Sequence, residues 1–318
     1  MPYINVDEVY IIDNTGLQVD QATDLPYTDA GLTESQQAQA RANIAAGGSN
    51  VNLLDNSFFQ VNQRGWTSGT ANNVYTVDRW KSSSSAIAVA VNADNSLTIT
   101  KTSGATGQIY QTLPWADDTS VFTFSVMDGD GNIYTRTATF ADTSYTNAVI
   151  NGVTVRLYLN YNTTTMAVSM YMASGQAGSF TIKACKLEKG SVSTLANDAP
   201  PNYAEELLKC QRYFIRLNAP YTGNGFAVGR AVTDGTNCRV FFPLPVTLRT
   251  SPTVSVSGLA NLQLFGNGST ITPTAVSYSG RSENGVSLQF TASSLTGNTL
   301  YMLCRGSSDA YIDLSADL

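Results

Sequence analysis

The sequence predicts an all-β protein with two β domains, and three observations lead to that prediction. Charged residues make up only 13% of the 318 residues, whereas Gly, Ser, Thr and Asn are abundant, a balance typical of short strands joined by polar turns. Short apolar or alternating runs recur along the chain, separated by turn-forming residues. The chain is also long enough for two cores, since a globular domain usually has roughly 100 to 200 residues.

The first 50 residues offer little material for a core. Residues 1–30 contain one strand-like run, Val9–Ile12, followed by a polar stretch that we expect to need a partner to be ordered. Leu32–Gly48 predicts a helix of roughly three to four turns, because Thr33 and Gln36 form a capping box and alanines favour helix. Alanine buries little area, so this helix either packs against copies of itself or another element, or is a solvated linker.

Residues 51–199 predict a β-sandwich. Val153–Tyr161 has apolar residues at its odd positions, the period-two pattern of a half-buried strand, and Met166–Met172 repeats it. Asp128–Gly131 and Asn162–Thr165 are turn-forming connections, so antiparallel pairing follows. The expected strands are Leu97–Thr100, Val121–Met127, Ile133–Phe140, Val153–Tyr161, Met166–Met172 and Phe180–Leu187.

The opening of this region combines apolar pairs, turn residues and tryptophans. Leu53–Leu54 and Phe58–Phe59 can anchor a first strand in the core. Trp80 ends an alternating run and is expected to be buried, whereas Trp66 follows a glycine and Trp115 a proline, which favours exposed loops. A tryptophan in a loop either offers a flat face to a sugar or covers the end of a sandwich.

Residues 200–318 predict a second β-sandwich. Pro200–Pro201 marks the border between the domains, and Asn202 with Glu205 caps a short helix, Tyr203–Cys210. The expected strands beyond it are Arg239–Phe242, Thr253–Val256, Val286–Phe290 and Thr299–Cys304.

The amino-acid composition limits the catalytic mechanisms that are open to this chain. The chain has no histidine, which removes the usual general base near neutral pH and every Ser-His or Cys-His nucleophile system. The four cysteines are far apart and lie in or beside apolar runs, so we expect free thiols that behave as small hydrophobes. They are Cys185, Cys210, Cys238 and Cys304.

The net charge and the hydropathy of the chain limit the kinds of binding partner that we expect. The net charge of -6 gives no cationic field, so neither nucleic acid nor an anionic membrane surface is an expected partner. The N-terminus has neither a basic leader nor a continuous apolar run, and no stretch of about 18 apolar residues occurs. We expect a protein that is made and folded in a cytosol and does not insert into a membrane.

Paired carboxylates are the remaining route to catalysis, because glycoside hydrolysis uses two of them. Asp117–Asp118 is the one adjacent pair in an aromatic loop, but neighbours in an extended segment point in opposite directions, so a turn is favoured. Asp128 and Asp130 look like half of a calcium loop and lack its later ligands. The sequence therefore predicts no catalytic residues and no metal ligands.

Two places in the second domain combine aromatic, amide and glycine residues suited to sugar hydroxyls and ring faces. Tyr221, Asn224 and Phe226 belong to one loop, and Tyr311 lies near the end of the chain. Surface loops without a ligand explain these residues equally well, because Asn and Gly also serve turn geometry. If Tyr221 and Phe226 contact the receptor, replacing them with alanine should abolish binding to host cells without lowering thermal stability.

Three segments carry a resemblance to the tail fibres and receptor-binding proteins of bacteriophages and prophages. Val51–Trp80, closed by Lys186–Phe214, resembles the carbohydrate-binding-module-like domains of these proteins. Leu32–Ile44 matches their LTxxQxAQARxNI element, except that Ala45 stands where a glycine commonly follows. Phe242–Gly258 resembles a stretch of their terminal head domains.

The resemblance implies a function and an assembly. It implies an elongated homotrimer with jelly-roll-like sandwiches, in which residues 1–30 attach to the phage tail or baseplate and residues 31–50 link or trimerise. Residues 51–199 would form the carbohydrate-binding module and residues 200–318 the receptor-binding head. The poor self-sufficiency of residues 1–50 also favours the homotrimer.

The expected function is non-catalytic attachment of a virion, through its tail tip, to a polysaccharide or other receptor on the bacterial surface. Two alternatives stay open: a tail-associated depolymerase, and a structural spacer without a ligand. The resemblance implies no cofactor, although a structural calcium ion near the first strand is compatible with it, with Asp55 and Glu188 as conceivable ligands. The expected contacts with glycan or receptor are Trp66, Trp115, Tyr221, Asn224, Phe226 and Tyr311.

Overall fold

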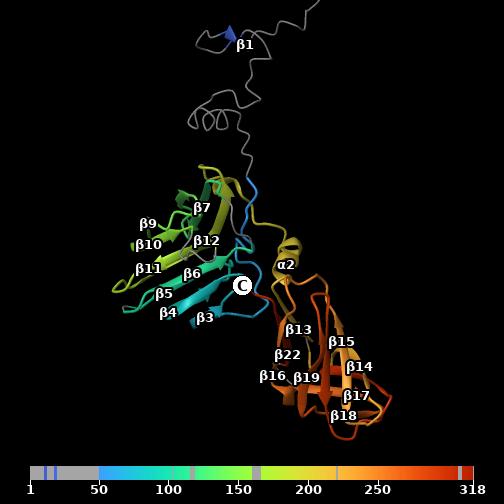
Figure 1. Ribbon diagram of the computed structural model, residues 1–318. Coiled ribbons are helices and arrows are strands. Elements are labelled where there is room, and N and C mark those ends of the chain that lie inside the picture. The colour runs from blue at the N-terminus through green and yellow to red at the C-terminus, as the bar shows by residue number, and fades with distance from the viewer. Residues whose placement is uncertain are drawn as a thin grey trace, which may run out of the picture. The chain divides into compact units, whose positions relative to one another are not determined.

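A computed structural model describes residues 11–12, 18–19, 50–102, 104–114, 119–159, 166–219, 221–306 and 310–317 (Figure 1). The chain divides into two compact units, Met1–Gly48 and Ser49–Leu318. In the first unit β1 (Ile11–Ile12) pairs with β2 (Gln18–Val19) in antiparallel fashion, whereas the helix expected at Leu32–Gly48 lies outside the described residues. Across the described residues strands dominate and one α-helix occurs, which confirms the all-β prediction.

The first sheet of the Ser49–Leu318 unit has ten strands and is antiparallel throughout. Its path runs β8-β7-β12-β5-β4-β6-β11-β10-β9, and β3 pairs with β4 beside this path. The strands are β3 (Ser68–Tyr75), β4 (Lys81–Val91), β5 (Leu97–Lys101), β6 (Gly107–Thr112), β7 (Phe122–Asp128), β8 (Ile133–Ala138), β9 (Thr146–Ile150), β10 (Val153–Tyr158), β11 (Ala167–Met172) and β12 (Gly178–Lys189).

Long strands that change partner bend this sheet over its own core. The first residues of β12, Gly178–Ile182, pair with β5, and after a bulge the remainder pairs with β7; a bulge of this kind sharpens strand twist and bend. β4 divides its length between β5 and β6 in the same way. The ends of the path, β8 and β9, approach each other, so the sheet encloses one hydrophobic core in a sandwich-like arrangement.

Sequence patterning explains the strands that frame this core. In β10 the apolar side chains of Val153, Val155 and Leu157 are buried, as the alternation predicts, and β11 pairs with β10 in antiparallel register. The expected hairpin between β7 and β8 is confirmed. Asp128 stabilises its turn by accepting hydrogen bonds from the N–H groups of Asp130 (2.9 Å) and Asn132 (2.8 Å).

The first strand predicted at residues 53–59 is wrong, although its core residues are buried as expected. Leu54 and Phe59 are buried in the first core, but this segment is a series of turns. Asn56 and Phe59 have φ values of 52° and 57°, in the left-handed region that extended strands do not use. The turns place one apolar residue of each pair in the core without strand geometry.

The second half of the unit contains a seven-stranded sheet, a three-stranded sheet and one α-helix. The sheet orders are β18-β17-β21-β14-β15-β20-β19 and β13-β22-β16. The elements are η2 (Leu195–Asn197), α2 (Tyr203–Gln211), β13 (Phe214–Asn218), β14 (Gly225–Ala231), β15 (Asn237–Pro243), β16 (Thr253–Ser257), η3 (Leu259–Asn261), β17 (Leu262–Gly266), β18 (Ser269–Ile271), β19 (Ala275–Arg281), β20 (Gly285–Thr291), β21 (Leu300–Arg305) and β22 (Tyr311–Ser315).

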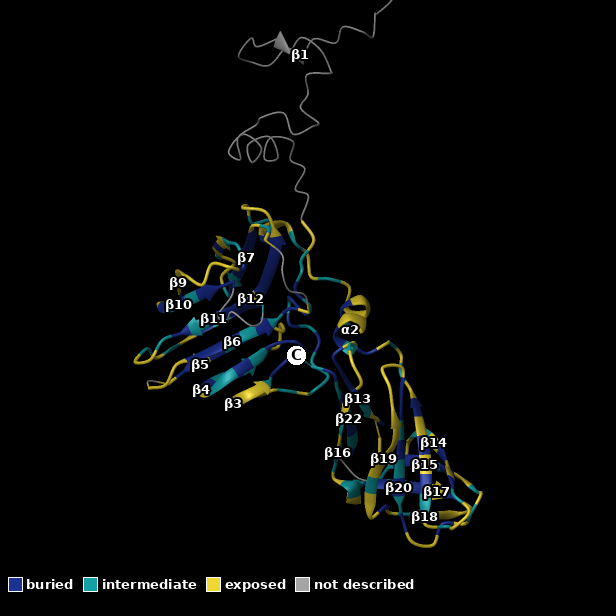
Figure 2. Ribbon diagram, in the orientation of Figure 1, coloured by how far each residue is buried: buried dark blue, intermediate teal, exposed yellow. Residues whose placement is uncertain are grey.

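Both of these sheets contribute to a second hydrophobic core. Ile312 and Leu314 of the three-stranded sheet belong to the same buried cluster as Val240 and Leu288 of the seven-stranded sheet. The two cores share no residue, and Pro200–Pro201 lies between them in sequence. Figure 2 shows that α2, which follows these prolines, is mostly exposed. The Asn202 side chain caps α2 by accepting from the N–H of Ala204 (2.9 Å).

The two cores are joined by polar and cation–π contacts within the Ser49–Leu318 unit. Arg64 forms ion pairs with Asp78 (2.7 Å) and with Asp317, and its guanidinium carbon lies 3.7 Å from the centroid of the Phe214 ring. The side chain of Gln63 donates to the Phe214 carbonyl (2.8 Å). Residues near both ends of the 63–317 span therefore meet at Arg64.

The expected free cysteines are confirmed. All four, Cys185, Cys210, Cys238 and Cys304, are unpaired and buried. Burial raises the pKa of each thiol, so the reactive thiolate is disfavoured.

Candidate functional site

The strand register gathers three loops at one end of the second core. Tyr311 pairs with Asn218 on one side and with Ser257 on the other, whereas Ser315, at the opposite end of β22, pairs with Phe214 just after α2. The described residues of the connections that leave the Tyr311 end include 221–224, 258–261 and 305–306. We call them the loop end of the domain, which lies away from α2.

Backbone hydrogen bonds hold the loop end together. The N–H of Gly223 donates to the carbonyl of Arg305 (2.6 Å), and the N–H of Arg305 donates to the carbonyl of Asn224 (3.1 Å). The N–H of Gly306 donates to the carbonyl of Asn261 (2.8 Å). Gly223 has a φ of 83°, which glycine adopts readily. The backbone of the 221–224 turn is therefore anchored to the backbone of Arg305 by two hydrogen bonds.

Tyr221 and Asn224 project from this anchored turn. The side chain of Tyr221 is 72% exposed and Asn224 is also exposed. Neither side chain makes a hydrogen bond to the described residues, while the N–H of Asn224 closes the turn on the carbonyl of Tyr221 (3.1 Å). An aromatic face and an amide thus stand free on a fixed backbone.

Phe226 plays a different part from its two neighbours. Its ring is half-buried against the second core, with its centroid 6.4 Å from that of Phe242. Its replacement by alanine would remove buried apolar area, so the expectation that Phe226 is dispensable for stability does not fit its position.

Tyr311 is half-buried under an arginine. The guanidinium carbon of Arg216 lies 3.7 Å from the ring centroid, and its Nε and Nη2 groups donate to the two oxygens of the Asp313 carboxylate (both 2.7 Å). One face of the Tyr311 ring is therefore covered by a fixed cation. Arg216 also donates to the carbonyl of Arg64 (2.7 Å).

Trp66 is fixed rather than free. Its indole N–H donates to the Val89 carbonyl (3.0 Å), and the Asn62 side chain bonds both backbone polar groups of Trp66. The indole is half-buried, and a Cβ added at Gly69 would lie 3.5 Å from it. Trp115 and the Asp117–Asp118 pair lie outside the described residues.

Trp80 is buried, as predicted, and it contacts Phe59 and Asn56. Its ring is fully buried and packs edge-on against Phe59 at 5.4 Å. Its indole N–H donates to the carbonyl of Asn56 (3.0 Å), so this tryptophan belongs to the core and not to a ligand site.

Carboxylates that could hold a metal are already engaged by the chain. Within the described ranges no group of three or more Asp, Glu or Cys side chains is arranged to bind a metal ion. Asp55 is paired with Arg79 (3.1 Å), and Glu188 accepts from the N–H (2.7 Å) and hydroxyl (2.6 Å) of Thr194. In the described part of the chain, no helix is long and apolar enough to span a membrane.

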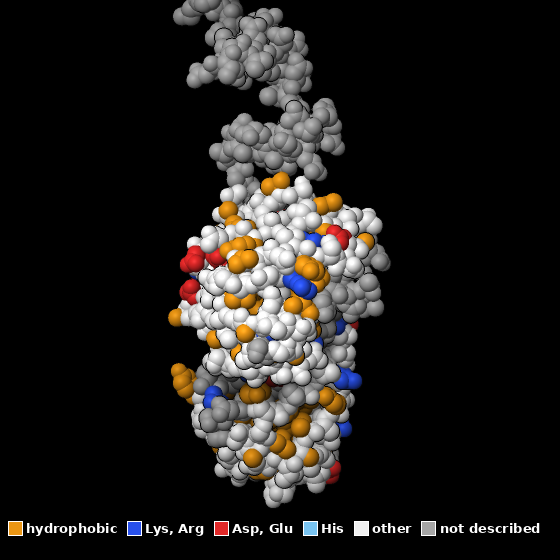
Figure 3. Space-filling view, turned by 90° about the vertical axis from the view of Figure 1, so that its left-hand side faces the viewer, with side chains coloured by type: hydrophobic (Ala, Val, Ile, Leu, Met, Phe, Trp, Pro, Cys, Tyr) orange, Lys and Arg blue, Asp and Glu red, His pale blue; other side chains and the backbone are white. Residues whose placement is uncertain are grey.

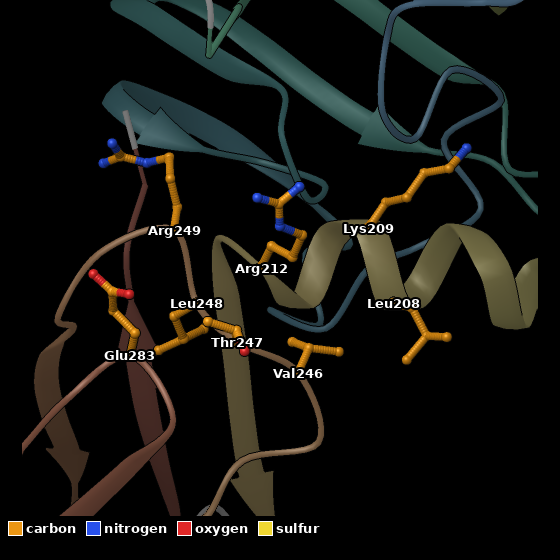
Figure 4. Close-up of a pocket in the computed structure, with 8 residues that line it drawn as sticks. All are labelled: Leu208, Lys209, Arg212, Val246, Thr247, Leu248, Arg249 and Glu283. Carbon is orange, nitrogen blue, oxygen red and sulfur yellow. The ribbon is translucent and has the colours of Figure 1, made fainter.

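A pocket that sequence reasoning missed lies between α2 and the β15–β16 connection (Figure 4). Its volume is about 580 Å³, within the range of small-molecule sites. The lining residues are Leu208, Lys209, Arg212, Val246, Thr247, Leu248, Arg249 and Glu283. They come from three separate segments, so spacing along the chain gave no signal of their proximity.

An exposed apolar row crosses the seven-stranded sheet. Val228 pairs with Met302, and Met302 with Phe265; the β14–β15 register places Phe241 beside Val228. Val228 and Phe241 are each 58% exposed and Phe265 is 47% exposed. We call Phe265, Met302, Val228 and Phe241 the apolar row. Contiguous exposed apolar surface of this kind marks interaction sites.

The surface carries few charges. On the face shown in Figure 3, acidic and basic side chains are scattered among uncharged ones, in keeping with the 13% charged residues of the chain.

No family model matches this chain, and no curated protein matches its sequence.

Proposed function

We propose that the chain is a non-catalytic receptor-binding protein of a phage tail, which attaches a virion through its tail tip to a glycan on the bacterial surface. The free side chains of Tyr221 and Asn224 on an anchored turn are the observation that carries this proposal. An aromatic ring can stack on the apolar face of a pyranose, and an amide can meet its hydroxyls.

The fibre architecture belongs to the same proposal. Residues 1–30 attach to the tail, two β-sandwich domains follow, and three copies assemble into an elongated fibre. The apolar row supports assembly, because an exposed apolar surface on an open sheet gains free energy when it is covered. Threefold repetition would raise the avidity of weak sites through effective concentration.

The test compares loop-end variants with a matched exposed tyrosine. Fluorescently labelled wild type, Tyr221→Ala and Asn224→Ala are titrated onto a panel of intact bacteria and their extracted polysaccharides. Tyr203→Ala is the control, because Tyr203 is 53% exposed but lies on α2. We expect saturable wild-type binding to one strain, a loss of about tenfold or more per loop-end change, and an unchanged midpoint of thermal unfolding.

Two other outcomes would replace the proposal. A fall in polymer size during incubation with wild type would identify a depolymerase. Assembly into virions without binding to any strain would identify a structural spacer. Equal loss of binding in Tyr203→Ala would remove the loop end from the receptor surface.

A further inference from the structure

The pocket beside α2 is preformed by backbone hydrogen bonds. The N–H of Arg249 donates to the carbonyl of Arg212 (2.8 Å), which ties the β15–β16 connection to the end of α2. The N–H of Leu248 donates to the carbonyl of Glu283 (2.8 Å), which ties the same connection to the β19–β20 turn. All three segments that line the pocket are therefore held together without a ligand.

The pocket has a net positive charge although the chain has a net charge of -6. Lys209, Arg212 and Arg249 line the pocket together with Glu283, and Lys209 is also paired with Glu206, so three cations meet two carboxylates. The C-terminus of α2 adds a partial negative charge of about half a unit, which is less than the remaining excess of one positive charge. The local field therefore favours an anion although the whole protein repels one.

Each of the three cationic side chains has N–H donors that are not used in hydrogen bonds to the described residues. Arg249 uses Nε and Nη2 to bind the carbonyls of Ala316 (3.0 Å) and Asp317 (3.1 Å), so its position is fixed while Nη1 has no hydrogen bond within the described residues. The exposed Arg212 side chain has neither an ion pair nor a hydrogen bond there. Lys209 lies 3.3 Å from Glu206 and can offer two further N–H donors.

The remaining lining suits a sugar ring. Figure 4 shows Lys209, Arg212 and Arg249 extending to one side, and Leu208 and Val246 to the other. Leu208 is 49% exposed, and the Thr247 hydroxyl donates to the side-chain oxygen of Asn284 (2.7 Å). A ligand with an oxyanion at one end and the apolar face of a ring at the other would match both sides.

We propose that this pocket binds the oxyanion of an acidic saccharide, a carboxylate or phosphate carried on a sugar ring, with Arg212 as its main charged contact. Guanidinium and oxyanion groups match in geometry and form charge-assisted hydrogen bonds. This second site is separate from the loop end, so it would stand even if Tyr221 had no part in binding.

Calorimetric titration of the full chain at low ionic strength tests the site with four probes: a uronate oligosaccharide, a sugar phosphate, inorganic phosphate and a neutral oligosaccharide of matched length. We expect one or both acidic saccharides to bind, more tightly than inorganic phosphate and with affinity that falls as salt is added. The preferred probe identifies the oxyanion as carboxylate or phosphate. Tighter binding of the neutral oligosaccharide, or equal binding of inorganic phosphate, would overturn the assignment.

Three variants locate the binding. Arg212→Gln is expected to weaken it by about tenfold, the usual effect of losing one charge-assisted hydrogen bond. Glu283→Gln is expected to strengthen it severalfold by removing the opposing carboxylate, a gain that a folding defect cannot produce. Arg230→Gln is the control, because Arg230 is an exposed arginine of β14. No binding by wild type, or equal effects of Arg212→Gln and Arg230→Gln, would contradict the proposal.

Discussion

The side chain of Asn56 links three parts of the 51–80 segment through hydrogen bonds. Asn56 is fully buried, and its side chain donates to the carbonyls of Val61 and Asp78 (both 2.8 Å) and accepts from the N–H of Val61 (2.9 Å). Its φ of 52° is one that asparagine tolerates better than alanine. We expect Asn56→Ala to lower the free energy of unfolding by about 3 kcal/mol.

Urea unfolding of Asn56→Ala measures this loss, with Asn95→Ala as the matched control. Asn95 also has a positive φ, 66°, but it is exposed. It should therefore show the backbone cost alone, about 1 kcal/mol. Equal losses in the two variants would mean that the buried hydrogen bonds of Asn56 contribute nothing net.

Asp78 makes stability depend on pH. Burial raises its pKa from 3.8 to about 6, in opposition to the neighbouring Arg64. Burial likewise raises the pKa of Asp317. A carboxyl group whose pKa is higher in the folded state stabilises the fold below about pH 4, and that contribution is lost as the pH rises through about 6. The loss for Asp78 amounts to roughly 3 kcal/mol.

The variant Asp78→Asn isolates this effect, since an amide does not ionise. We expect its free energy of unfolding, measured relative to wild type in urea at pH 4, 5, 6 and 7, to rise with pH and to level off above about pH 7. Comparing the variant with wild type cancels the pH dependence that other carboxylates contribute to stability. Asp128 is one of these: desolvation raises its pKa, but hydrogen bonds lower it by more. A relative stability that falls with pH would show that the Arg64 ion pair outweighs burial.

At the scale of elements, the sequence predicted those whose pattern is set by burial on one face. β11 and β12 lie within two residues of their expected ranges, and β10 begins at the expected Val153 and ends three residues early, because alternating apolar residues can bury themselves in one way only. α2 was predicted from its cap, and the Asn202 side chain forms that cap. Local chemistry alone decided these elements.

Strands without that pattern were missed, among them β4 and β19. β4 reads KSSSSAIAVAV, so serines fill its first half, and it is ordered by its pairing with β3, β5 and β6. β19 is mostly exposed and pairs with β20 alone. Such strands owe their state to partners distant in sequence, which propensity does not report.

The candidate site residues also divide into those whose exposure follows from local sequence and those whose environment depends on distant strands. The exposure of Tyr221 followed from local turn chemistry, whereas the cover of Arg216 over Tyr311 depends on the register of β13 and β22. The fixed position of Trp66 depends on the Val89 carbonyl, 23 residues away. Long-range pairing therefore decides which predicted aromatic residues remain free to meet a ligand.

At the scale of the whole molecule, the apolar row leads to a prediction about assembly. If three copies bury this row, the mass by light scattering should be three times the chain mass of 34.0 kDa. Two charges placed in the row by Val228→Glu and Phe241→Glu should lower the mass toward that of one chain, because burying an unpaired carboxylate costs several kcal/mol. Both side chains are more than half exposed, so the second core should tolerate the change.

Val149→Glu is the matched control for this experiment. Val149 lies on β9 of the ten-stranded sheet and is 58% exposed, the same fraction as Val228. It should keep the wild-type mass, and all variants should keep the wild-type strand content by circular dichroism, because the unfolding midpoint itself changes when a trimer dissociates. A wild type with the mass of one chain would refute the homotrimer. A trimer that survives the double substitution but dissociates in Val149→Glu would move the contact to the first sheet, since the charge then acts where apolar surface is buried.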